Sequence, residues 1–292
     1  MSIRLPLLAA TAALLMPVMA SASTLSGLPE SCFTYELSGT KAATHGLTAK
    51  TLHATLTGTD ITLDIRGVNL SDPSGHVESA TLERFNAVAA YAALSAFRGG
   101  ISAACKDQSL TINSSDIRSG TPQAAWTDVT LARPGHNMTI RKASIQAVQT
   151  TPDLRLKVEG TGIHDTKQPL MPTQLSADLT VQGLDTARQQ ITINALHAVS
   201  GSSAIGSSAI DGKGSIEPGA TASTSAADLH VSVTNVDTLI GQIRDTAPKK
   251  VVAALTIARL MGRQSGDATL WDIGLSGGVV TVNRIPLPFS VP

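Results

Sequence analysis

The sequence predicts an α+β protein that is mainly antiparallel β, with a large curved sheet or β-groove and two amphipathic helical regions. The first observation is that apolar and polar residues alternate along many short segments separated by Gly, Asn or Asp, as in strands with one buried face. The second is that helical spacing of apolar residues occurs in two regions, at about 79–98 and 235–262. Two amphipathic helices against such a sheet give an α+β architecture.

The strand segments begin with a predicted hairpin. Residues 52–56 and 61–65 alternate apolar and polar side chains, and Gly58-Thr59-Asp60 supplies the turn between them. The same alternation recurs at residues 110–112, 129–131, 138–140, 154–158, 175–181, 191–195, 229–233 and 280–282. The inward residues are the candidate contacts for an apolar ligand, and they include Leu63, Ile65, Leu179, Val181, Val231 and Val233.

The two helical regions have recognisable ends. In the first, apolar residues from Leu82 to Ala96 fall near helical spacing, and Gly99-Gly100 ends the helix. The second region is broken at Pro248, which suits the first turn of a helix that continues to about residue 262.

The first 22 residues predict a cleaved signal peptide. Arg4 is the positive region, Leu5–Ala20 is the apolar region, and Ala20-Ser21-Ala22 is an A-x-A cleavage site. The alternative is an uncleaved anchor, but this apolar region is shorter than the ~20 residues of a membrane span. We therefore expect residues 23–292 to form a single β-rich domain that is periplasmic or secreted, with no transmembrane anchor after cleavage.

Cys32 and Cys105 are the two cysteines of the chain. In an exported protein, two cysteines most simply form one disulfide. The alternative, two buried free thiols, stays open.

Composition excludes several classes of function. The chain has 22 basic and 22 acidic residues and only 3% aromatic residues, so it lacks the long-range field and the stacking platforms that favour nucleic acid. No two of its seven histidines have metal-ligand spacing, and the phosphate-binding glycine motifs are absent. The sequence therefore predicts no nucleic-acid partner, no cofactor and no metal.

One segment matches a catalytic pattern. Gly274-Leu275-Ser276-Gly277-Gly278 fits the G-x-S-x-G elbow of hydrolases, in which a helix must follow the serine. Here the strand-like residues 279–282 follow instead, so a Gly-rich hairpin is the better interpretation.

The C-terminal part of the chain resembles that of AsmA-like proteins and related uncharacterised bacterial periplasmic families. The resemblance rests on a strand at residues 228–233, a Pro-broken helical stretch, and the closing segments 280–283 and 285–288. It implies a curved β-groove whose apolar inside holds acyl chains, and a role in envelope maintenance or lipid movement. The sequence departs from the family at Arg284, where Gly is common, and in its cleaved rather than anchoring N-terminus.

Three functional hypotheses follow. The first is an exported non-enzymatic envelope protein that binds lipid or another hydrophobe in an apolar β-groove. The second is a structural or partner-binding envelope protein with a closed β core, joined to a partner by strand edges. The third is a hydrolase that uses Ser276. An open groove and a closed core require the same alternation, so the sequence does not distinguish the first two.

Overall fold

The computed structural model describes residues 32–100, 115, 118–168, 171–184, 186, 188–202, 206–219, 221, 223–244 and 256–290. Their structure is mainly antiparallel sheet with few helices, which confirms the predicted fold class. The chain divides into two compact units: unit 1 comprises Met1–Pro152 and Asp165–Lys167, and unit 2 comprises Asp153–His164 and Gln168–Pro292. The expectation of a single domain stays a prediction, because two compact units of one chain can fold together or separately.

The sheet of unit 1 is antiparallel throughout. Its strands are β1 (Phe33–Ser38), β2 (Lys41–Ala43), β3 (Gly46–Ala49), β4 (Thr51–Leu56), β5 (Thr62–Ser71), β6 (Gln123–Arg133) and β7 (His136–Gln149). They pair in the order β1-β4-β5-β6-β7, and β2-β3 adds to β5. Leu52 lies opposite Ile65 across β4 and β5, so the predicted hairpin is confirmed.

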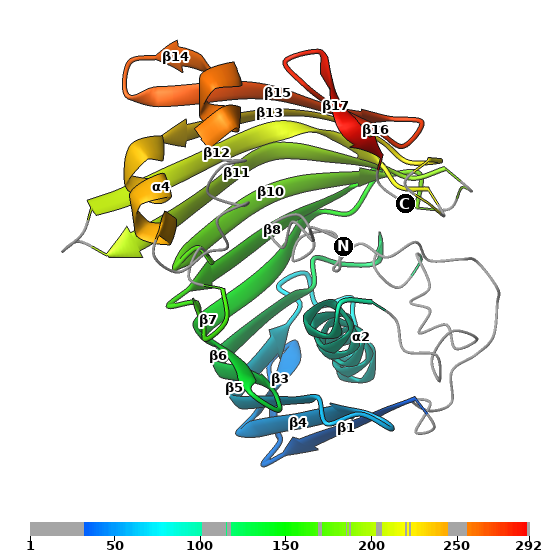
Figure 1. Cartoon of the computed structure of the whole chain (residues 1–292). Helices are drawn as coiled ribbons and strands as arrows, with labels where there is room; N and C mark the ends of the chain where they lie inside the picture. Colours follow the sequence, from blue (N-terminus) through cyan, green and yellow to red (C-terminus); the bar gives the residue numbers. More distant parts are fainter. Residues whose placement is uncertain are drawn as a thin grey trace. The chain divides into compact units, whose positions relative to one another are not determined.

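Helix α2 (Ser79–Arg98) covers the apolar face of the unit 1 sheet (Figure 1). The helix has the predicted bounds, and it ends at Gly99, whose φ of 92° is left-handed and whose N–H bonds to the Ser95 and Ala96 carbonyls. Leu82 and Leu94 on the helix share one core with Leu52 and other strand residues. The apolar face of this unit is therefore closed by its own helix.

A buried polar cluster spans the α2 side of this core. The Asn86 amide donates to the Tyr35 hydroxyl at 2.7 Å and accepts from the Trp126 indole at 2.7 Å. Asn86 is 1% exposed, so these bonds satisfy an amide that would otherwise be buried without partners. Burial also raises the pKa of the Tyr35 hydroxyl well above its usual range.

Asp72 fixes the connection from β5 to α2. Its carboxylate is fully buried and accepts hydrogen bonds from the backbone N–H groups of Ser74, His76, Val77 and Thr121. Burial alone would raise the pKa of this carboxyl. The hydrogen bonds, that from the Ser74 hydroxyl first among them, instead hold the pKa well below its usual range.

The strands of unit 2 are likewise antiparallel. Its strands are β8 (Leu154–Thr161), β10 (Gln174–Gln182), β11 (Gln190–Ser202), β12 (Gly206–Glu217), β13 (Ala226–Thr234), β14 (Arg263–Ser265), β15 (Ala268–Ser276), β16 (Val279–Val282) and β17 (Ile285–Ser290). They pair in the order β8-β10-β11-β12-β13-β15-β16-β17, and β14 adds to β15. The short strand β9 (His164–Asp165) follows β8 in the chain.

Two stretches of the described residues of unit 2 are helical. Helix α4 (Val236–Arg244) and a helical turn at residues 256–261 both fall within the predicted region 235–262. Residues 245–255, with the predicted break at Pro248, lie outside the described residues, as do the signal peptide at 1–22 and the strand predicted at 110–112. Among the helices that the structure describes, none has the length and apolar character needed to cross a membrane.

Candidate functional site

An apolar row crosses the unit 2 sheet at right angles to its strands. Each residue in the row lies directly opposite the next in the strand register. The row runs through Leu156, Leu179, Ile193, Gly214, Leu229, Ile273 and Val282. With strands about 4.8 Å apart, seven strands give a row of about 29 Å. One leaflet of a bilayer core is about 15 Å thick, so the row is longer than an extended acyl chain of a membrane lipid.

Two glycines interrupt the apolar side chains at β12, in the middle of this face. Gly214 has a φ of 151°, and a Cβ there would collide with the Asp228 carbonyl oxygen, so close approach of the backbone requires glycine. Gly212 has no such constraint, because the nearest contact of a Cβ there would be Leu196 Cδ2 at 3.4 Å. The face over β12 is therefore low in side-chain volume, and its flanking residue Ile216 is only half-buried.

Helix α4 covers one end of this face. Val236, Leu239 and Ile240 on the helix pack against Val233 of β13 and Trp271 of β15. The helix contacts β12 and β11, so within the described residues of unit 2 its cover is local rather than complete.

The predicted ligand contacts divide between the two units. Leu63 and Ile65 belong to the closed core of unit 1, where they are 2% and 5% exposed. The other four lie on the apolar face of unit 2, where Val233 packs beside α4 and Val231 is half-buried. Leu179 and Val181 are buried at 2% and 3% exposure. The unit 2 face thus combines an apolar row with half-buried positions such as Val231 and Ile273.

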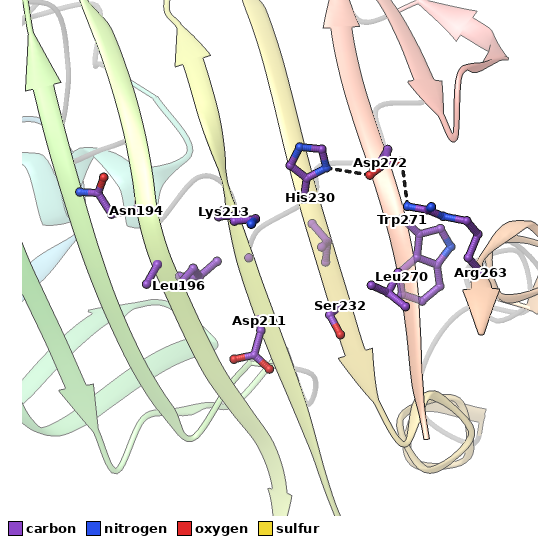
Figure 2. Close-up of a pocket in the computed structure, with 13 residues that line it drawn as sticks. Asn194, Leu196, Asp211, Lys213, His230, Ser232, Arg263, Leu270, Trp271 and Asp272 are labelled. Carbon is purple, nitrogen blue, oxygen red and sulfur yellow. Dashed lines mark hydrogen bonds and ion pairs between the residues drawn. The ribbon is translucent and has the colours of Figure 1, made fainter. Parts of the chain in front are cut away.

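Unit 2 also has a hollow of about 460 Å³ over β11, β12, β13 and β15 (Figure 2). Its polar lining includes Asp211, Lys213, His230, Ser232 and Asp272, which alternate with the apolar residues of the same strands. Apolar residues line it too, among them Leu196, Val231, Leu270 and Trp271. A volume of this size is within the range of small-molecule sites.

Three residues of the hollow, His230, Asp272 and Arg263, are joined by hydrogen bonds. His230 Nδ1 donates to Asp272 Oδ1 at 2.7 Å, and Arg263 Nη2 donates to Asp272 Oδ2 at 3.1 Å. The hydrogen bond from His230 is the main reason that the pKa of Asp272 lies below its usual range, and the charges of Arg263 and Arg284 lower this pKa further. Asp272 is therefore a paired carboxylate, bonded to His230 and Arg263.

The hollow does not contain a nucleophile activated by a base in this structure. Ser232 and His230 lie two residues apart on one strand, about 6.7 Å along its axis, and no hydrogen bond joins them among the described contacts. Ser276 ends β15 in a hairpin: it lies opposite Val279, and Gly277 and Gly278 make the turn with φ of 57° and 77°. The predicted Gly-rich hairpin is thus confirmed, with a strand in place of the helix that follows a hydrolase elbow.

Pairs of histidine and aspartate recur on exposed strand faces. His53 Nδ1 lies 2.7 Å from Asp64 Oδ1 across β4 and β5, and His197 Nδ1 lies 2.7 Å from Asp211 Oδ1 across β11 and β12. Each pair matches the geometry of His230 and Asp272. Sequence reasoning missed these pairs, because the partners meet only through strand register. The alternation alone did indicate that these side chains face solvent.

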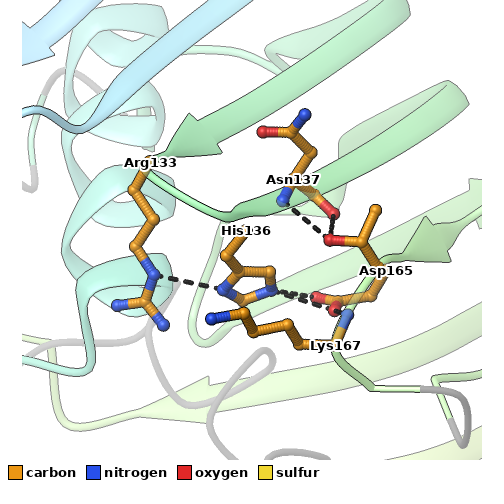
Figure 3. Close-up of polar contacts among 6 residues, drawn as sticks. Arg133, His136, Asn137, Asp165 and Lys167 are labelled. Carbon is orange, nitrogen blue, oxygen red and sulfur yellow. Dashed lines mark hydrogen bonds and ion pairs between the residues drawn. The ribbon is translucent and has the colours of Figure 1, made fainter.

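A fourth pair is buried in unit 1 (Figure 3). His136 Nε2 donates to both oxygens of Asp165, at 2.8 and 2.9 Å, and Arg133 Nε donates to His136 Nδ1 at 3.1 Å. Because an arginine N–H can only donate, Nδ1 accepts, and the imidazole is neutral with its proton on Nε2. The Phe97 ring lies 4.6 Å from the imidazole. Both ring nitrogens of His136 are thus held by hydrogen bonds within the unit.

Metal-ligating groups do not gather in the described part of the chain, where no cluster of three or more His, Cys, Asp or Glu side chains occurs. Cys32 is 1% exposed beside Phe33 in the unit 1 core. Its predicted disulfide partner Cys105 lies outside the described residues, so the disulfide stays a prediction.

Comparison with known proteins finds no matching family model, no matching curated protein and no matching solved structure.

Proposed function

We propose that this is an exported, non-enzymatic envelope protein that binds the acyl chain of a lipid, or a similar envelope hydrophobe, on the apolar face of unit 2. The observation that carries the proposal is the apolar row from Leu156 to Val282, with its low side-chain volume at Gly212 and Gly214. Burial of apolar chain against such a face contributes about 0.8 kcal/mol per methylene.

The contrast between the two units supports this assignment. The sheet of unit 1 carries a helix of 20 residues over its apolar face, whereas among the described residues of unit 2 helix α4 has 9 residues and covers one end. A sheet whose only role was to form a closed core would favour large side chains opposite Leu229 and Val231, where β12 instead has Gly214 and Gly212.

Gly212 offers a direct test. Its backbone is not in the left-handed region, and a Cβ would make only ordinary contact with Leu196. Gly212→Val therefore adds volume to the apolar face without backbone strain. Lys213→Val is the matched control, because it places the same side chain on the opposite face of the same strand.

The experiment is to secrete the full precursor, purify the mature protein without detergent, and identify bound lipid by mass spectrometry of an organic extract. The proposal predicts co-purified lipid in the wild type and in Lys213→Val, and its loss in Gly212→Val. An extract free of lipid in all three proteins would refute it. If the lipid-free protein instead purified in a stoichiometric complex with another envelope protein, the partner-binding hypothesis would replace it. The intact mass also tests cleavage before Ser23.

A further inference from the structure

The exposed large apolar side chains of the described residues all belong to the C-terminal part of unit 2. The large apolar residues that are exposed within the described residues are Ile257, Leu260, Val279 and Ile285. Leu260 is 81% exposed, the highest value of the four, and Ile257 and Ile285 are 58% and 55% exposed. A leucine that projects so far into solvent makes almost no contact with its own protein, so it contributes little to folding.

Asn283 links two segments that carry exposed apolar residues, the helical turn 256–261 and the turn between β16 and β17. Its side-chain amide donates to the Met261 carbonyl at the end of the helical turn 256–261, and its Oδ1 accepts from the Asp272 backbone N–H at 2.8 Å. Both Asn283 and Arg284 have left-handed backbone, with φ of 50° and 66°. The tight turn between β16 and β17 is thereby fixed against the turn that carries Leu260, and Ile285 follows directly after it.

The same two segments carry exposed cations. Arg263 follows the helical turn and is 68% exposed in its side chain, and Arg284 is exposed in the β16–β17 turn. Between Thr256 and Gly266 the chain has two arginines and no acidic residue. The next residue, Asp267, is acidic. Arg263 bonds to Asp272 at 3.1 Å, and the charge of Arg284 acts on the same carboxylate, so Asp272 is shared between two guanidinium groups.

We propose that Leu260, Ile285, Arg263 and Arg284 form a membrane-docking patch, which inserts its aliphatic side chains into an anionic lipid surface and binds lipid phosphates with its arginines. Apolar residues flanked by cations are the composition of segments that lie in the membrane interface. An arginine matches phosphate geometry with two parallel donors. A bilayer surface is favoured over a protein partner because the patch consists of protruding tips on two turns, rather than a continuous flat or concave face.

The charge balance of the whole chain sets the expected behaviour. With 22 basic and 22 acidic residues, the protein has no long-range attraction to an anionic surface. The arginines act only within a Debye length, about 8 Å at physiological salt. Docking therefore depends on contact by the patch and weakens as salt is raised. This proposal concerns residues separate from the acyl-chain face, and either can fail without the other.

The test is flotation of the full-length mature protein with vesicles of phosphatidylcholine alone, or of phosphatidylcholine mixed with phosphatidylglycerol. Binding to the mixed vesicles should exceed binding to the neutral ones. Removal of both cations in Arg263→Gln/Arg284→Gln should weaken it about fivefold per arginine. Leu260→Ser/Ile285→Ser should weaken it by at least about tenfold, because insertion of a leucine is worth more than 1.4 kcal/mol.

Matched variants elsewhere on the surface serve as controls. Val279→Ser removes the exposed apolar residue on the other hairpin, and Arg66→Gln/Arg141→Gln removes two exposed arginines of unit 1. These variants should bind like the wild type. Equal loss in the controls, equal binding to neutral vesicles, or no binding to either vesicle would overturn the proposal. So would a soluble dimer that Leu260→Ser/Ile285→Ser dissociates, since the patch would then be a protein interface.

Discussion

Replacement of Asp72 by asparagine should destabilise unit 1 by about 3 kcal/mol. The carboxylate shares its donors between two oxygens: Oδ1 accepts from the Ser74 and Thr121 N–H groups, and Oδ2 accepts from the His76 and Val77 N–H groups. Asparagine retains one oxygen, so either amide orientation leaves two backbone N–H groups facing an NH₂. Each buried N–H without an acceptor costs about 1–3 kcal/mol.

Equilibrium unfolding in urea measures this effect. Trp126 reports on unit 1, and a Trp271→Phe background removes the second indole from the fluorescence signal. Asp60→Asn is the control, because Asp60 is exposed in the turn between β4 and β5 and should change stability by less than about 0.5 kcal/mol. If Asp72→Asn and Asp60→Asn lowered the free energy of unfolding equally, the proposed role of the buried carboxylate would be wrong.

The same substitution has a pH signature. The pKa of Asp72 is lower in the folded protein than the value of about 3.9 expected in the unfolded chain. The stability due to its charge is therefore complete above about pH 5 and decreases as the pH falls through and below 3.9. The difference between wild type and Asp72→Asn should be constant between neutral pH and about pH 5, and should shrink at lower pH. A difference that grew on acidification would contradict this sign.

Three further predictions concern buried groups of unit 1. Asn86→Leu should lower the free energy of unfolding by about 2–3 kcal/mol, measured in urea, because the half-buried Trp126 indole N–H and the Tyr35 phenol both lose their partner. His136→Phe should lower it by about 3 kcal/mol, since buried Asp165 would lose the imidazole that donates to both of its oxygens; unchanged stability would exclude a structural role. Cys32→Ser should remove a disulfide to Cys105, seen as a mass difference on reduction of the wild type alone, with about 2–4 kcal/mol lost.

Local patterns were sufficient to predict α2 and many, but not all, of the strands, since β1 and β17 were not foreseen. The bounds of α2 followed from apolar spacing and from Gly99, because both signals lie within the helix or next to it. The alternation in β5 likewise predicted that Leu63 and Ile65 face inward. These inferences succeeded because burial of one face constrains every second residue of a strand.

Long-range contacts were beyond the same reasoning. His230 and Asp272 are 42 residues apart and meet because β13 pairs with β15, a pairing that no local pattern specifies. Leu63 and Leu179 have the same alternating neighbours, yet one lies beneath α2 and the other on the face of unit 2. Only tertiary structure shows which apolar face receives a helix of sufficient length to cover it.

The strand edge at the end of unit 2 bears on the choice between the first two functional hypotheses. β17 pairs with β16, and the described residues show no other strand beside it. Its sequence includes Pro286 and Pro288, which lack a backbone N–H. Proline on an edge strand removes donors that an added strand would need. Association by strand addition is therefore disfavoured at this edge, and a partner-binding role would need another surface, whereas acyl-chain binding on the apolar face of unit 2 requires no free edge.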